Sequence, residues 1–226
     1  MQKLIAAALL VIGTTATHAA EVTYHFADGI DNDVAGVDLG GDGSSGEIQI
    51  AEGEVGSTAV TQGGLTVTMY ATPHIAGELT GHFNHNTGDF GIDSEGTDTS
   101  DAFDYSGGDG TESMEFWFDH PGTLVSMDFD RLENDESLTL ALDDGPAVNY
   151  SGADTDSSDL LNDINLDFAQ GQHITLSPAA DTGTDYFGLE SITLNATAIP
   201  EPSVLALLSL ALTALSLIRR PRHLRK

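Results

Sequence analysis

Short runs in which apolar and polar residues alternate recur along the middle of the chain, and long apolar runs occur only near its two ends. Alternation with a period of two is typical of half-buried β-strands, because successive side chains point to opposite faces of a sheet. The pattern predicts strands at Val22–Phe26, Glu47–Ala51, Leu65–Tyr70, Ser113–Phe118, Thr123–Phe129, Ser137–Leu142, Ala147–Tyr150, His173–Leu176 and Gly188–Ala196. Helical spacing of Leu160, Leu161 and Ile164 favours one short helix at Ser158–Ile164.

Glycine-rich and aspartate-rich segments separate these runs and are typical of turns. They include Gly40-Gly41-Asp42-Gly43, Gly63-Gly64, Gly107-Gly108-Asp109-Gly110 and Asp144-Gly145-Pro146. Many short strands joined by such turns indicate an all-β fold, either a β-sandwich or a jelly roll. The sequence shows no fixed repeat, which argues against a solenoid. About 179 residues, from Glu21 to Ile199, are enough for a single sandwich domain.

The N-terminal residues have the three parts of a secretory signal peptide. Lys3 is the positive part, Leu4–Gly13 is apolar, and Thr14–Ala20 consists mainly of small residues. We expect cleavage after Ala19, which makes residues 1–19 the signal peptide, with cleavage after Ala20 as the alternative. A permanent anchor is a weaker explanation, because an apolar run of about ten residues is short for a membrane span. The chain has no cysteine, so its fold needs no disulfides in an oxidising compartment.

Residues 200–226 contain three blocks in order. The motif Pro200, Glu201 and Pro202 is followed by an uncharged apolar run over 203–218 and a basic tail over 219–226. As a transmembrane helix the apolar run would measure roughly 24 Å, a little less than an ordinary span. Basic residues hold such an end on the cytoplasmic side and so act as a stop-transfer signal; here they are Arg219, Arg220, Arg222, Arg225 and Lys226.

These three blocks together resemble the PEP-CTERM sorting signal of Gram-negative bacteria. In that family an exosortase, a membrane-embedded transpeptidase-like enzyme, is thought to process the tail near the Pro-Glu-Pro motif. Families with this signal are associated with exopolysaccharide, biofilm and floc matrices. The resemblance implies export across the inner membrane by the Sec machinery, transient anchoring by the helix, and delivery to the cell surface or extracellular matrix. An ordinary C-terminal tail anchor is the alternative.

Parts of the segment between the two signals resemble PEP-CTERM ectodomains more weakly. The similar parts are Phe90-Gly91-Ile92-Asp93, Thr111–Asp119, Leu124–Phe129 and Tyr186–Leu194. Those ectodomains look like lectin-type or carbohydrate-binding jelly rolls. The resemblance therefore implies a single lectin-like β-sandwich ectodomain over residues 20–199, and none of its motifs specifies a sugar.

Charge is distributed very unevenly along the chain. The segment from Glu21 to Ile199 holds 35 of the 36 acidic residues and only Arg131 of the seven basic ones, a net charge of about −34. Such a surface repels nucleic acid and anionic lipid, and it repels an anionic polysaccharide unless divalent cations bridge the two. We expect no nucleic-acid partner. A solvated, salt-adapted surface and structural calcium are both open as explanations of the charge.

Three acidic clusters have a composition that suits calcium, which takes six to eight oxygen ligands. The candidates are Asp28, Asp31 and Asp33 in the first cluster, Asp93, Asp98 and Asp101 with Glu95 and Asp104 in the second, and Asp154, Asp156 and Asp159 with Asp163 in the third. None of the clusters has the residue order of an EF-hand loop. Taken singly, each is better explained as a solvated loop, so calcium is a candidate cofactor rather than a required one.

Candidates for other chemistry are few. His74, His82 and His85 could bind zinc only if a local turn brought them together, and we favour a polar surface loop there. We find no nucleophile elbow, zinc-protease motif, phosphate-binding loop or cysteine nucleophile. A glycosidase needs two carboxylates at a defined separation, and the candidate pairs are Glu112 with Glu115 and Asp128 with Asp130. Because acidic residues are abundant, such pairs are expected by chance.

The strand at Ser113–Phe118 contains the only tryptophan of the chain. Alternation places Met114, Phe116 and Phe118 on one face and Glu115, Trp117 and Asp119 on the other. If the first face is the core, Trp117 lies exposed beside two acids, an arrangement that suits sugar stacking, so Trp117, Glu115 and Asp119 are the candidate glycan contacts. The alternatives are a strand covered on both sides, or a tryptophan that covers a neighbouring strand.

The sequence thus predicts an exported, non-enzymatic protein of the cell envelope or extracellular matrix. Its role would be structural or carbohydrate-associated, as a component of exopolysaccharide or biofilm. A secreted glycan hydrolase that uses paired carboxylates is the alternative.

Overall fold

The computed structural model describes residues 19–26, 46–51, 53–76, 81–85, 90–94, 103–106, 110–132, 136–143, 145–156, 158–179 and 186–199. The predicted signal peptide, apart from Ala19, and the whole predicted sorting tail lie outside these residues. The part from Ala19 to Ala198 belongs to one compact unit. Among the described residues, no helix has the length and apolar character needed to cross a bilayer.

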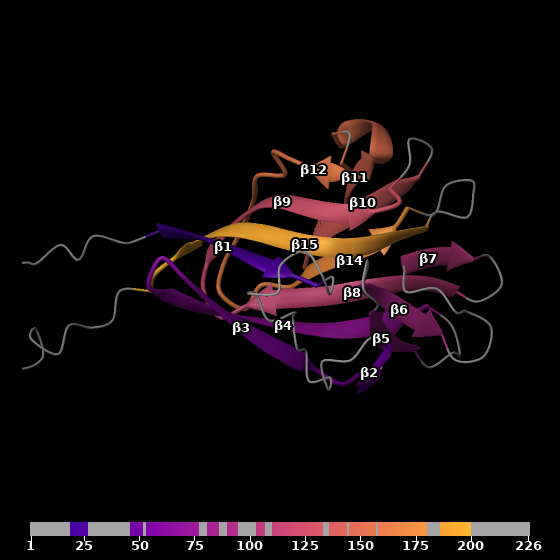
Figure 1. Ribbon diagram of the computed structural model, residues 1–226, viewed down its shortest axis with the longest axis horizontal. Helices are drawn as coiled ribbons and strands as arrows, with labels where there is room; N and C mark the ends of the chain where they lie inside the picture. The colour runs from indigo at the N-terminus through magenta and orange to yellow at the C-terminus, as the bar shows by residue number, and fades with distance from the viewer. Residues whose placement is uncertain are drawn as a thin grey trace, which may run out of the picture. The chain divides into compact units, whose positions relative to one another are not determined.

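The described chain is built almost entirely of antiparallel strands (Figure 1), which confirms the all-β class. The strands are β1 (Ala19–His25), β2 (Gly46–Ala51), β3 (Gly56–Gln62), β4 (Leu65–Ile75), β5 (Gly81–His85), β6 (Phe90–Ser94), β7 (Phe103–Ser106), β8 (Gly110–Phe118), β9 (Gly122–Asp130), β10 (Ser137–Leu142), β11 (Val148–Ser151), β12 (Leu160–Leu161), β13 (Leu166–Phe168), β14 (Ile174–Pro178) and β15 (Tyr186–Thr197). A single 3₁₀ turn, η1 (Gly152–Asp154), follows β11.

The strands form a sandwich-like arrangement of two layers. In one layer β15 lies between β1 and β9, and the short strands β12 and β13 pair with β9 (Figure 1). The other layer has the order β3-β4-β8-β14-β10-β11. The short strand β7 pairs with both β15 and β8 and so joins the two layers. A separate small sheet has the order β2-β5-β6.

Tyr24 fastens the two layers together in the middle of the core. Its ring, on β1, lies 5.8 Å from the ring of Phe118 on β8. Its hydroxyl donates a buried hydrogen bond of 2.8 Å to the backbone carbonyl of Val67 on β4. Burial raises the pKa of this phenol, and the charge of Asp119 raises it further, so the group stays a neutral donor. A buried tyrosine hydroxyl needs such a partner, since an unpaired one costs about 1–3 kcal/mol.

A chain of phenylalanine contacts extends the core toward the small sheet. Phe83 on β5 packs against Phe90 on β6, with ring centroids 4.9 Å apart. The contacts continue from Phe90 to Phe103 at 6.4 Å, from Phe103 to Phe187 at 5.5 Å, and from Phe187 to Phe129 on β9 at 5.3 Å. Fully burying each such ring contributes about 1.5–3 kcal/mol. The small sheet is therefore attached to the sandwich through aromatic side chains.

The nine strands predicted from alternation are all present, as β1, β2, β4, β8, β9, β10, β11, β14 and β15. The prediction missed β3, β5, β6, β7, β12 and β13, which are short or mostly polar and so give little periodic signal. The turn predicted at Gly63-Gly64 is confirmed, because it joins β3 to β4 as a two-residue hairpin loop. Both glycines have positive φ, 58° and 81°, as the favoured hairpin turn requires.

The helix predicted at Ser158–Ile164 is wrong. Leu160 and Leu161 form β12 instead and pair with β9. Asp159 and Asp163 have φ of 56° and 60°, a left-handed conformation that no α-helix of L-residues can contain. The apolar spacing in this segment reflects burial of Leu161 and Ile164 against the sandwich, not a helical face.

Candidate functional site

The face of β8 that points away from the core carries the residues selected from the sequence. Met114, Phe116 and Phe118 are completely buried, which confirms that they form the inner face. Glu115 and Trp117 lie on the outer face and are partly exposed. The inward packing of three apolar residues thus positions these polar and aromatic side chains toward solvent.

Trp117 is the middle member of a stack of three rings. Tyr70 lies directly opposite on β4, with ring centroids 5.7 Å apart and planes inclined by 13°. His173, just before β14, lies 4.4 Å away with its plane inclined by only 4°. Because β4 and β14 flank β8 on opposite sides, both faces of the indole are covered. The tryptophan therefore covers its neighbours, and a sugar could reach only its edge, so the glycan contact stays a prediction.

Glu115 lies between two histidines from neighbouring strands. Its Oε1 is 2.7 Å from Nδ1 of His173, and its Oε2 is 3.3 Å from Nε2 of His74. Partial burial raises the pKa of Glu115, but the hydrogen bonds and charges of the two histidines outweigh burial, and the net pKa is lowered. The carboxylate is therefore ionised and held by partners on both oxygens.

Asp119, the third candidate glycan contact, is also held within the protein. Its Oδ1 accepts a hydrogen bond of 2.8 Å from the backbone N–H of Thr68 and lies 2.7 Å from Nδ1 of His120. Partial burial raises the pKa of Asp119, but the bonds from His120 and Thr68 outweigh burial and lower it overall. Asp119 therefore fastens the end of β8 to β4, and a ligand would have to share it.

Sequence reasoning missed the part played by Tyr70, His173 and Asp143 at this site. Asp143 fixes His173: its Oδ1 accepts the His173 backbone N–H at 3.0 Å, and its own backbone N–H donates to the His173 carbonyl at 2.7 Å. Gln172 donates a further bond of 2.9 Å to Oδ2 of Asp143. The bonds from Gln172 and His173 lower the pKa of this exposed carboxyl. Only strand pairing brings these residues beside Trp117, and the sequence carries no signal for it.

The structure describes only part of the predicted calcium residues. Outside the described residues lie Asp28, Asp31, Asp33, Glu95, Asp98 and Asp101. Of the second cluster, Asp93 and Asp104 are described, as strand residues of β6 and β7. In the third cluster, Oδ2 of Asp154 accepts bonds from the Ser151 backbone N–H at 2.8 Å and from the Ser151 hydroxyl at 3.0 Å. Oδ1 of Asp156 accepts the backbone N–H of Ser158 at 2.8 Å. Asp154 and Asp156 thus stabilise local turns.

Asp128 on β9 is a neighbour of this third cluster that the calcium prediction did not include. Partial burial raises the pKa of Asp128, and the charges of Asp156 and Asp159 raise it further, against the lowering effect of the Phe129 backbone N–H. Its Oδ1 is buried without a hydrogen-bond partner among the described residues. Within that same part of the chain, no three His, Asp or Glu side chains are placed to hold a metal. Calcium binding stays a prediction.

The carboxylates and histidines considered for catalysis or zinc have the following surroundings. Glu112 is buried on the inner side of β8, whereas Glu115 lies on the outer side, so this pair does not converge. Asp130 forms an ion pair with Arg131, its Oδ2 lying 2.9 Å from Nε. His82 and His85 belong to strand β5, so the expectation of a loop there is wrong. His74 has Glu115 as its partner.

No family model, curated protein or solved structure matches this chain. Any function must therefore be argued from the residues of the chain itself.

Replacing Glu115 with Gln removes the charge between His74 and His173 and preserves the shape of the side chain. Because the folded-state pKa of Glu115 is depressed, the stability that its charge contributes is present above the ordinary carboxylate pKa and is lost as pH falls through the depressed value. We expect E115Q to lower the free energy of unfolding by about 1 kcal/mol at pH 6 and by less near pH 3. Urea unfolding followed by Trp117 fluorescence measures both values.

Glu21, an exposed glutamate of β1, provides the matched control. E21Q should change the free energy of unfolding by less than about 0.5 kcal/mol at either pH. An E115Q effect of equal size at pH 6 and pH 3 would show that the charge of Glu115 is not what matters.

Proposed function

We propose that this protein is exported, sorted by an exosortase and delivered to the cell surface or extracellular matrix. There it acts as a non-enzymatic, structural or carbohydrate-associated component of exopolysaccharide or biofilm. The observation that carries the proposal is the ordered succession of Pro200-Glu201-Pro202, an apolar run and a basic tail, which resembles the PEP-CTERM signal. Residues 1–19, with the parts of a signal peptide, provide the matching export signal.

The limits of the folded unit support this division of the chain. The first strand begins at Ala19, at the proposed signal-peptide cleavage point, and the last strand ends at Thr197, just before the Pro200-Glu201-Pro202 motif. In the β1–β15 pair Ala20 lies opposite Ala196, so the two ends of the domain are adjacent. We propose that residues 20–199 are the mature ectodomain and that its sandwich is of the lectin-like jelly-roll type.

Charge narrows the class of polysaccharide that fits this ectodomain. Five of the seven basic residues of the chain lie in the basic tail, and a sixth, Lys3, lies in the leader. Once both are removed, Arg131 is the single basic residue among 35 acidic ones. Such a protein associates with a neutral polysaccharide directly, and with an anionic one only through bridging cations.

The outer face of the β3–β11 layer supports the carbohydrate-associated part of the proposal. Edges of the Tyr70, Trp117 and His173 rings reach this face, and hydroxyl-bearing residues of β10 and β14 extend it. Thr139 and Ser177, for example, lie opposite each other, with their hydroxyl oxygens 2.7 Å apart. Aromatic edges and hydroxyl groups match the apolar and polar parts of a sugar ring.

Sorting is tested by replacing Pro200, Glu201 and Pro202 with alanine. We expect the wild-type protein to be released from its host without the basic tail, and the variant to stay in the membrane fraction with its tail intact, because the processing enzyme no longer recognises it. Mass spectrometry of the purified proteins fixes both cleavage points. Ile199→Ala, just before the motif, is the control and should be processed normally. If the triple variant were processed like the wild type, the sorting proposal would be wrong and the C-terminal segment would be explained as an ordinary tail anchor.

Carbohydrate association is tested by incubating the purified protein with the exopolysaccharide of its host. We expect cosedimentation without release of reducing ends, and about tenfold weaker binding for Trp117→Ala, which corresponds to about 1.4 kcal/mol. Val55→Ala, which removes an exposed apolar side chain remote from the ring stack in sequence, is the control. Reducing ends that accumulate with time would overturn the non-enzymatic proposal and favour the glycan hydrolase.

Calcium binding at the third acidic cluster is a further part of the proposal, since a cation would relieve the repulsion among Asp128, Asp156 and Asp159. Without calcium, D159N should raise the free energy of unfolding by about 0.5 kcal/mol, because it removes one like charge. Calcium at 100 times its Kd should raise the free energy of unfolding of the wild type by about 2.7 kcal/mol, which appears as a higher melting temperature. The same calcium concentration should stabilise D159N less. Asp163→Asn is the matched control for D159N. Both residues have positive φ, and of the two only the charge of Asp159 raises the pKa of Asp128. An identical melting temperature in millimolar calcium and in chelator would exclude the site.

A further inference from the structure

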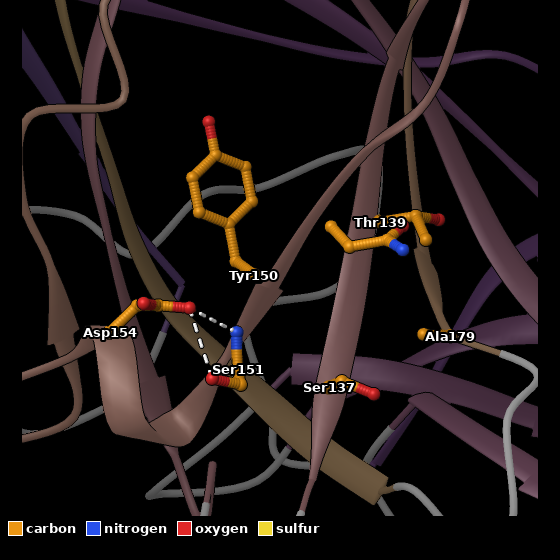
Figure 2. Close-up of a pocket in the computed structure, with 7 residues that line it drawn as sticks. Ser137, Thr139, Tyr150, Ser151, Asp154 and Ala179 are labelled. Atoms are coloured by element: carbon orange, nitrogen blue, oxygen red, sulfur yellow. Dashed lines mark hydrogen bonds between the residues drawn. The ribbon is translucent and has the colours of Figure 1, made fainter.

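A hollow of about 410 Å³ lies at the β10–β11 end of the second layer (Figure 2). Its walls include Ser137 and Thr139 of β10, Asn149, Tyr150 and Ser151 of β11, and Asp154 of η1. The ring stack of Trp117 contributes no residue to it, and neither do Asp128, Asp156 and Asp159. A volume of this size is near the lower end of the range for small-molecule sites, about 300–1,000 Å³.

The polar groups of the hollow are positioned by the same alternation that builds the core. Leu138 and Leu140 are buried, so Ser137 and Thr139 occupy the opposite face of β10. Strand pairing places Ser151 opposite Ser137 and Asn149 opposite Thr139. Three hydroxyl groups and an amide are therefore brought to one surface at strand spacing, about 4.8 Å from their neighbours across the ladder.

Asp154 is held in place before any ligand arrives. Its Oδ2 accepts hydrogen bonds from the backbone N–H and the hydroxyl of Ser151, as the dashed lines in Figure 2 show. These bonds close the capping box of η1. The capping bonds use only Oδ2, so Oδ1 can accept a bond from a ligand hydroxyl at little entropic cost.

Tyr150 lies between Asn149 and Ser151 in β11, and its ring occupies the opposite face of the strand. Its partner across the ladder is the buried Leu138, and the ring packs against the core. Figure 2 shows Tyr150 and Asp154 on one side of the view and Ser137 and Thr139 on the other. The side chains of β11 that share a face with Ser137 and Thr139 are therefore those of Ser151 and of Asn149, which is exposed.

We infer that this hollow binds one neutral sugar residue of a polysaccharide, an inference that rests on the proposed carbohydrate association. Hydroxyl, amide and carboxylate groups around a small space match a ligand that carries several hydroxyls, since each such hydroxyl both donates and accepts. Asp154 and Asn149 bind the hydroxyls of the sugar. Asp154 and the acidic domain around it exclude uronic acids and other anionic residues, because a second carboxylate would be repelled.

The test uses the full-length chain in a detergent without a sugar headgroup, so that the detergent does not compete. Saturation-transfer NMR with glucose, galactose, mannose and N-acetylglucosamine, each examined separately, should detect at least one ligand with a Kd on the order of 1 mM, typical of a small site with few contacts. Glucuronate should give no signal. Asn149→Ala should weaken binding at least fivefold, whereas Tyr150→Phe, on the opposite face of β11, should leave it unchanged.

Asn162→Ala is the matched control, since Asn162 is an exposed asparagine outside the hollow, and it should bind like the wild type. Equal binding by N149A and the wild type, or binding of glucuronate as strong as that of a neutral sugar, would overturn the inference. Cosedimentation with exopolysaccharide separates the two proposals. A protein that binds the polymer equally well with and without N149A retains its proposed function but not this site, whereas absence of both kinds of binding removes both.

Discussion

The burial of alternate side chains of β8 is the constraint on which the rest of the structure depends. This strand lies between β4 and β14, and its residues Met114, Phe116 and Phe118 are completely buried against the opposite layer. Because the side-chain period of a strand is two, their burial fixes Glu115 and Trp117 on the outer face. A slip of one residue would bury a carboxylate and a tryptophan and expose three apolar groups. Packing of the core therefore also specifies the candidate site.

Among the described residues, negative charge is stabilised without lysine and almost without arginine. Histidines hold Glu115, and backbone N–H groups hold Asp143, Asp154 and Asp156. A partly buried carboxylate needs such donors, because desolvation without hydrogen bonds is costly. Asp128, which has acidic neighbours and a buried oxygen with no partner among the described residues, shows the opposite case in its raised pKa. Asp143, Asp154 and Asp156 thus lie where turns and strand ends offer donors.

The ring stack and the polar hollow belong to the same layer. Tyr70, Trp117 and His173 lie across its middle strands, whereas Thr139 and Asn149 lie toward the β11 edge. Both sets occupy positions that alternate with buried residues, and so both belong to its outer side. An extended polymer could contact the two regions together, and two weak contacts on one rigid surface give a higher combined affinity than either alone.

The sequence by itself determined the all-β class, nine of the strands, the Gly63-Gly64 turn and the inward and outward faces of β8, because each follows from local alternation or backbone conformation. It could not determine which strands are neighbours. Glu115 meets His74 and His173, which are 41 and 58 residues away in sequence, only because β4 and β14 pair with β8. The same is true of the hollow, which strand pairing and a 3₁₀ turn assemble. Register between distant strands is fixed by packing of the whole sandwich, a cooperative property that no short window of sequence contains.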